Sequence, residues 1–180
     1  MQAPLPKQLK IGLVTKAPGG YAVAPDCLDG VAKAVKLVKD LGAVIEEVEL
    51  TADTDELKLA TNTLWTANLA ASLEAYTNAT GHVYTENDIE PANFYMAKLG
   101  HKLKAKDYAH ALSAMHKAGR EMGYVMQQYD LLLMPTLAQL PVDIGALVYT
   151  SDKGSVNDFY KDKGFAFSPF TSLFNVTGQP

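Results

Sequence analysis

The sequence predicts an α/β fold, with a mainly parallel, twisted sheet flanked by helices. Two short runs, Leu9–Val14 and Asp130–Met134, have the length and continuous hydrophobicity of buried strands. Between them lie long segments in which apolar residues recur every three or four positions, as they do on helices. Strands that are joined through helices are typical of a parallel sheet. We expect residues 1–180 to form a single α/β domain.

The first part of this domain, residues 9–50, is predicted to be a strand, a helix and a second strand. The loop Lys16–Pro25 contains Pro-Gly-Gly and must turn sharply. It lacks the Gly-x-Gly-x-x-Gly and Gly-Lys-Ser/Thr patterns of phosphate-binding loops, so a plain connection is favoured. The strand within Ala43–Leu50 is acidic on one face, which favours a position near the edge of the sheet.

The helix of this unit is predicted over Asp26–Leu41. Apolar side chains recur along one face, at Leu28, Val31, Val35, Val38 and Leu41. Gly42 follows and is expected to end the helix in a left-handed conformation.

The second part, residues 53–129, is predicted to be helical. Asp53–Thr80 carries a broad apolar belt that includes Trp65, together with small polar residues that are either solvated or face a pocket. Pro91 is expected to open a short helix that Gly100 closes. Lys106–Tyr129 is the longest regular pattern. Its predicted buried stripe includes Gly119, which suggests close approach to another element; the full stripe is Tyr108, Leu112, Met115, Gly119, Met122, Met126 and Tyr129.

The third part, residues 130–180, is predicted to be a core strand, a long loop and a terminal helix. The apolar run in Asp130–Met134 is typical of a central strand. Thr136–Phe167 is predicted to be a loop, and loops of this length tend to line sites. Ser168–Pro180 has a short apolar helical face, with Asn175 and Gly178 as expected terminators. The chain stops where a strand would be expected, so we expect it to be a piece of a longer protein.

Composition excludes several classes of function. The formal net charge is −4, and basic residues are scattered among acidic ones, which disfavours nucleic acid and anionic membranes as partners. No segment has the ~20 consecutive apolar residues of a membrane span. Cys27 is the only cysteine, so an internal disulfide framework is impossible. Without a signal peptide at its start, the chain is expected to be cytoplasmic.

Catalytic constellations are not evident from the residues alone. His110 and His116 are six positions apart and do not share a helix face, so no metal site is predicted. There is no Gly-x-Ser-x-Gly elbow for a serine triad. Cys27 lies at a helix start, but no histidine is indicated as its partner, and a passive thiol is favoured.

Three segments resemble the amidase signature family. Phe-Thr-x-x-Phe-Asn-Val-Thr-Gly-Gln-Pro, from Phe170 onward, is similar to a late core motif of that family. Asp130-Leu-Leu-Leu-Met-Pro-Thr136 resembles a second element, and Leu9–Leu50 a third. The loop Pro-Gly-Gly-x-x-Val-x-Pro is similar to the branch that includes 6-aminohexanoate cyclic-dimer hydrolase.

The resemblance implies hydrolysis of a linear or cyclic amide by a Ser-Ser-Lys mechanism, without metal or cofactor. In the family both serines come from a Gly-Gly-Ser-Ser-rich segment, with the lysine before it, and no part of residues 1–180 matches either. The chain therefore resembles the part downstream of that segment, and its catalytic residues are expected elsewhere. The residues that the resemblance places beside the substrate are Thr136, Leu137, Ala138, Phe170, Thr171 and Asn175. For each of them, a purely structural role is an open alternative.

Two further expectations follow. The rival to an amidohydrolase fragment is a non-enzymatic ligand-binding or interaction domain that is complete at this length. If the chain is a fragment, the sheet beside Asp130–Met134 has an open edge, and we expect a homo-oligomer that covers it.

Overall fold

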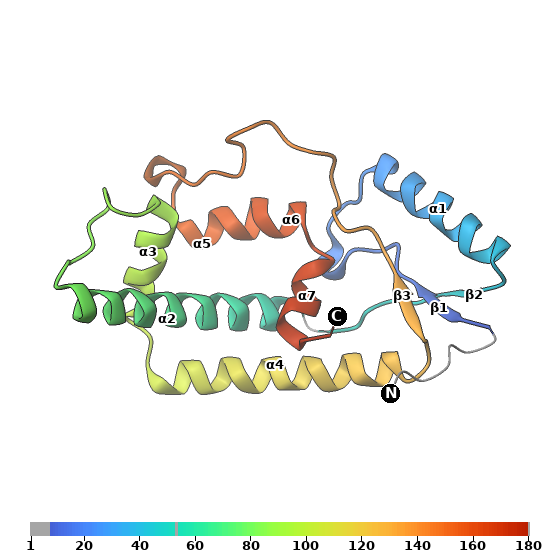
Figure 1. The fold of residues 1–180 in the computed structure, drawn as a ribbon, viewed down its shortest axis with the longest axis horizontal. Coiled ribbons are helices and arrows are strands. Elements are labelled where there is room, and N and C mark those ends of the chain that lie inside the picture. Colours follow the sequence, from blue (N-terminus) through green and yellow to red (C-terminus); the bar gives the residue numbers. More distant parts are fainter. Residues whose placement is uncertain (1–7, 53, 180) are drawn as a thin grey trace. The chain divides into compact units, whose positions relative to one another are not determined.

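The computed structural model describes residues 8–52 and 54–179, apart from the side chain of Asp162. The chain divides into two compact units. The first comprises Met1–Ala52, Ala118–Pro141 and Ala166–Pro180, and the second Asp53–Lys117 and Val142–Phe165. Figure 1 shows the elements of both units. No helix in the described residues is both long and apolar enough to cross a membrane.

The first unit is built on a parallel sheet of three described strands (Figure 1), as predicted. These strands are β1, Lys10–Leu13, β2, Val44–Glu47, and β3, Leu131–Leu133, in the order β2-β1-β3. β1 is therefore central, and the prediction that the apolar run of β3 occupies the centre is wrong for the described strands. The hydrophobicity of three leucines predicts a strand but does not specify how many neighbours it has; Leu131 is 50% exposed.

Helix α1, Pro25–Asp40, connects β1 to β2. It begins at Pro25 because the fixed φ of proline suits the first helical position, where no N–H is needed. Val31 is buried on the predicted apolar face, but Leu41 is 78% exposed because the helix has already ended. Gly42 has φ +94°, which confirms the predicted left-handed ending.

In the second unit, α2, Thr54–Thr80, packs against α3, Pro91–Gly100. The two backbones meet at Gly100, where a Cβ atom would lie 2.1 Å from the carbonyl oxygen of Thr66. Thr66 is buried, and its Oγ1 donates a hydrogen bond to the Asn62 carbonyl at 2.8 Å, so this polar side chain is satisfied within its own helix. Trp65, which was predicted to join the apolar belt, is 61% exposed.

Helix α4, Ala105–Met126, buries Met122 of the predicted stripe and leaves the other stripe residues within it half-buried. Its buried residues are Ala111, Ala114, Ala118 and Met122. Ala111 and Ala114 pack with Ala60 of α2. The expected close approach at Gly119 is wrong, since a Cβ there would meet no atom within 4 Å. The prediction followed the largest side chains, whereas the face that packs closely is the alanine face one position earlier along the helix.

The predicted loop Thr136–Phe167 is wrong in its second half, which contains short helices. It contains η2, Ser151–Lys153, α5, Val156–Phe159, the π-helix η3, Tyr160–Gly164, and α6, Phe165–Phe167. The missed signal is the spacing of apolar residues at Val156, Phe159 and Tyr160, which is helical.

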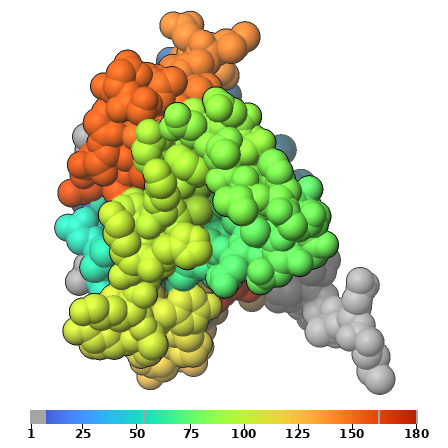
Figure 2. Space-filling model, turned by 90° about the vertical axis from the view of Figure 1, so that its left-hand side faces the viewer, coloured from blue at the N-terminus to red at the C-terminus, as the bar shows by residue number. Residues whose placement is uncertain are grey.

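Aromatic packing fixes α5 in the second unit. Val156 and Phe159 are buried with Tyr149 and, from α3, Ala92 and Met96. The ring of Tyr149 meets that of Phe159 edge to face, with centroids 5.6 Å apart. The space-filling view shows α3 (yellow-green) beside the orange segment that contains α5 (Figure 2).

The last helix, α7, Thr171–Thr177, belongs to the first unit. Gly178 ends it at φ +76°, as predicted, and donates its N–H to the Phe174 carbonyl at 2.9 Å. Asn175 lies inside the helix and is exposed, so its predicted role as a terminator is wrong.

Gly42→Ala is expected to destabilise the chain by about 1 kcal/mol, because alanine adopts a positive φ only at a cost. Chemical denaturation measures the change. Gly30→Ala is the matched control, since Gly30 lies inside α1 with no neighbour within 4 Å of its Cβ position. That change should stabilise by roughly 0.5–1 kcal/mol. Equal effects of the two substitutions would contradict the left-handed ending.

Gly100→Ala is expected to cost about 3 kcal/mol or more, because a methyl group at 2.1 Å from a backbone oxygen forces α2 and α3 apart. The thermal unfolding midpoint reports the loss. Gly119→Ala in α4 places the same methyl group in open space and should raise the midpoint slightly. A tolerated Gly100→Ala would show that the two helices do not meet at this residue.

Candidate functional site

The candidate site lies at the carboxyl ends of β1 and β3, in the first unit. Val14 follows β1 and donates its N–H to the Leu133 carbonyl of β3 at 2.9 Å, which holds the two strand ends together. The loops that follow these strands therefore leave the sheet side by side. In open α/β sheets, ligands bind in the crevice outside the carboxyl ends of the strands.

Ala138 joins three segments of chain at this end of the sheet. Its N–H donates to the Phe167 carbonyl at 3.0 Å, and its own carbonyl accepts the N–H of Ala24 at 2.7 Å. Its methyl group is fully buried. The loop after β1, the loop after β3 and the segment that leads into α7 are thus tied to one residue. A larger side chain at position 138 would have no room in this arrangement.

A small apolar cluster fills the space around Ala138. Val14, Ala17 and Phe170 are buried with it, and the Phe170 ring is fully enclosed. Partly buried residues surround the cluster: Tyr21, Val23, Val48, Leu50 and Met134. Burying a phenylalanine contributes about 1.5–3 kcal/mol. The cluster therefore stabilises the loops at the carboxyl ends of the strands.

The structure brings some of the six predicted substrate-binding residues together. Ala138 and Phe170 belong to the same buried cluster. Leu137 and Thr171 are half-buried, and Thr136 and Asn175 are exposed. The role of all six toward a substrate stays a prediction.

Backbone groups of the loop after β1 also shape this end of the sheet, and the sequence reasoning did not single them out. Ala24 is extended, with φ −61° and ψ +139°, which frees its N–H to reach Ala138. The signal was present in the next residue, because Pro25 disfavours a helical conformation at the residue before it. In the same loop Gly19 and Gly20 have positive φ, and Gly20 donates its N–H to the Ala17 carbonyl at 3.1 Å.

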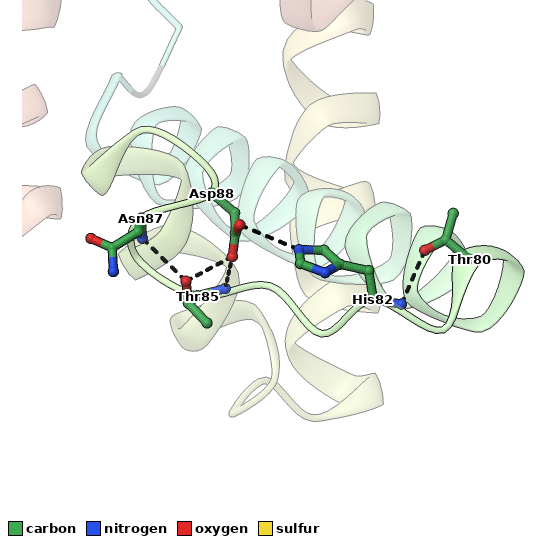
Figure 3. Close-up of polar contacts among 5 residues, drawn as sticks. All are labelled: Thr80, His82, Thr85, Asn87 and Asp88. Carbon is green, nitrogen blue, oxygen red and sulfur yellow. Dashed lines mark hydrogen bonds and ion pairs between the residues drawn. The ribbon is translucent and has the colours of Figure 1, made fainter.

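The connection between α2 and α3 carries a polar network around Asp88 (Figure 3). One carboxylate oxygen of Asp88 accepts hydrogen bonds from the N–H and the hydroxyl of Thr85, each at 2.7 Å. The other lies 3.3 Å from Nε2 of His82. The hydrogen bonds from Thr85, with a smaller contribution from His82, hold the pKa of Asp88 below its ordinary value of 3.8. The network therefore orders the connection between α2 and α3.

Potential metal ligands do not cluster in the described part of the chain. No three His, Cys, Asp or Glu residues there form a group that could hold a metal ion. Cys27 is a free, half-buried thiol in the first turn of α1.

Comparison with known proteins links the chain to amide-hydrolysing enzymes. A model of the Amidase family matches residues 2–180. A lipoamidase from Enterococcus faecalis is 23% identical over 186 residues, which cover 94% of this chain and 26% of that protein. The solved structure of 6-aminohexanoate cyclic dimer hydrolase with its substrate is similar at 24% identity and a TM-score of 0.85, over 97% of this chain and 37% of that one.

A bacterial aryl acylamidase of the amidase signature family is similar at 24% identity and a TM-score of 0.73. The match covers 95% of this chain and 35% of that one. These likenesses confirm the predicted fold class. The chain spans between 26% and 37% of the length of these relatives.

In the wild-type chain, acid is expected to reduce the order of the connection between α2 and α3. Asp88→Asn is expected to remove this pH dependence. Because the pKa of Asp88 is lowered by folding, its stabilising contribution is complete above the ordinary value of 3.8. It is lost as the pH falls through the lower value in the folded chain. The protection factor of the Thr85 amide against hydrogen exchange, measured on both sides of this range, reports the loss.

Glu86→Gln is the control for this experiment, since it removes a carboxylate from the same connection without touching the network. It should keep the pH dependence of the wild-type chain. An equal pH dependence of Thr85 protection in Asp88→Asn would show that another group controls the loop.

Proposed function

This chain belongs to the amidase family, and we propose that it forms part of an enzyme that hydrolyses the amide bond of a small linear or cyclic molecule. The family match over residues 2–180 carries this proposal. The names of the similar proteins, a lipoamidase, a cyclic dimer hydrolase and an aryl acylamidase, all refer to amide substrates. The cyclic dimer of 6-aminohexanoate is the first substrate to test.

The mechanism that we propose uses two serines and a lysine. The hydroxyl oxygen of one serine attacks the amide carbonyl carbon while its proton passes through the second serine to the lysine. Backbone N–H groups stabilise the negative oxygen that forms. The C–N bond then breaks, the amine leaves with a proton, and water hydrolyses the remaining serine ester to a carboxylate. This reaction needs no cofactor.

We place the catalytic residues of this mechanism outside residues 1–180. The chain has six serines: Ser72, Ser113, Ser151, Ser155, Ser168 and Ser172. None of them lies in a Gly-Gly-Ser-Ser run, which supplies both the nucleophile and the flexible backbone for an oxyanion hole. The chain would then contribute substrate binding rather than the chemical step.

The contribution that we propose is one wall of the substrate pocket, at the carboxyl ends of β1 and β3. Thr136 is exposed, while Leu137 and Thr171 are half-buried, so these side chains are available to contact a substrate. Ala138 and Phe170 are fully buried and would hold the wall in position without touching the substrate. We place the protein in the cytoplasm, since its single cysteine allows no internal disulfide framework.

The test uses a serine-directed fluorophosphonate probe on the purified chain. We expect no labelling and no amide hydrolysis above background, because no serine here has an activating lysine in the proposed mechanism. A family member that carries the Gly-Gly-Ser-Ser segment serves as the positive control. Stoichiometric labelling of one of the six serines would contradict the proposed location of the nucleophile.

The coding sequence upstream of Met1 provides the second readout. A Gly-Gly-Ser-Ser segment in the same reading frame supports the amide hydrolase. An upstream sequence without such a segment, together with an unlabelled chain, would favour a non-enzymatic binding domain.

A further inference from the structure

A pocket of about 310 Å³ in the second unit combines both signs of charge with an aromatic wall. It is lined by Ala146, Lys153, Asp158, Phe159 and Lys163. All five belong to the segment Val142–Phe165. The volume lies at the small end of the range of roughly 300–1,000 Å³ that ligand pockets occupy. Lys153, Asp158 and Lys163 are exposed, so the pocket is open to solvent and a ligand of the size of one amino acid would be only partly buried in it.

Lys153 is held in place on one side of the pocket. Its Nζ donates a hydrogen bond to the Val148 carbonyl at 2.6 Å and lies 5.3 Å from the centre of the Phe159 ring. Phe159 is itself buried in the aromatic cluster with Tyr149 and Val156, so the ring does not move freely. An ammonium group has three donors, and this hydrogen bond uses one of them. The others remain for a carboxylate ligand.

Asp158 and Lys163 supply the other two charges of the lining. Asp158 lies in α5, and Lys163 lies in the π-helix η3 that follows it directly. The Phe165 N–H donates to the Tyr160 carbonyl, the bond across five residues that defines a π-helix. In the described part of the chain neither Asp158 nor Lys163 forms an ion pair, although both line the same pocket. Both charges are therefore available to a ligand.

From this arrangement we infer that the pocket binds a small zwitterionic amino acid whose ammonium and carboxylate groups are separated by an apolar spacer. The ligand carboxylate binds Lys163 and Lys153, the ligand ammonium binds Asp158, and the spacer lies on Phe159. Asp152 interacts electrostatically with Lys153, so two lysines and two aspartates balance in charge around the pocket, which favours neither a simple amine nor a simple acid. The carboxylate of Asp158 disfavours a simple acid. A molecule that carries both groups satisfies all three charged side chains.

The experiment titrates the isotopically labelled 180-residue chain with 6-aminohexanoate and follows the backbone amide signals of Ala146 and Phe159 by NMR. Hexanoate and hexylamine are the comparison ligands, since each keeps the spacer and one of the two charges. We expect 6-aminohexanoate to bind about three- to fivefold more tightly than either, as one additional exposed ion pair allows. This inference concerns binding alone, so its outcome does not depend on the proposed amide hydrolysis.

Two variants test the roles of Lys163 and Asp158 separately. Lys163→Gln should weaken binding of 6-aminohexanoate and hexanoate about threefold and leave hexylamine unchanged. Asp158→Asn should weaken binding of 6-aminohexanoate and hexylamine and leave hexanoate unchanged. Lys106→Gln and Glu74→Gln change the same kinds of charge elsewhere in this unit and should have no effect. Equal affinity for the three ligands, equal effects of all four variants, or no shift of the two amide signals at tens of millimolar ligand would overturn the inference.

Discussion

Close backbone contact around Ala138 is the constraint on which the carboxyl end of the sheet depends. Its two backbone hydrogen bonds link it to Ala24, which lies 114 residues earlier in the sequence, and to Phe167, which lies 29 residues later. They form only because the side chain between them is a methyl group that the surrounding apolar cluster can bury completely. The register of β1 and β3 brings their carboxyl ends together, and Ala138 then fixes the loops that leave them.

The second unit shows the same dependence on small residues at points of close approach. Gly100 lets the backbone of α3 lie against the Thr66 carbonyl of α2, and the alanines of α4 do the same against Ala60. Large side chains such as Trp65 lie on the exposed side of α2. Packing in this unit is therefore determined by the positions of its smallest residues, together with an aromatic cluster around Tyr149.

We assign to this chain one part of the proposed amide hydrolysis. The family match covers nearly all of this chain, yet the chain corresponds to about a third of the solved relatives. A rigid set of loops at the strand ends is suited to hold a substrate, because positioning requires side chains whose own places are fixed by packing. The mechanism that we propose needs an activated serine, and the sequence of this chain contains no segment of the kind that supplies one. We propose that this chain binds the substrate and that residues outside it cleave the bond.

The sequence by itself determined the elements of the chain and their order. Apolar runs and helical periodicity predicted β1, α1, β2, α2, α3, α4 and β3, and glycine predicted the endings at Gly42 and Gly178, because backbone conformation is a local property of these residues. Three segments taken together, Leu9–Leu50, Asp130–Thr136 and the motif from Phe170 onward, also indicated the family. For the six predicted site residues, the sequence indicated the positions in the chain but not how exposed each side chain is.

Only the tertiary structure decided which face of α4 is buried, that β3 lies at an edge of the described sheet, and that Val156–Phe167 is helical. It also decided that Ala138 and Phe170 are enclosed while Thr136 faces water. Periodicity predicts that a residue such as Gly119 lies on an apolar stripe, but the distance to the next helix depends on residues far away in the sequence. Burial and close contact are properties of pairs of segments, and a single segment does not contain them.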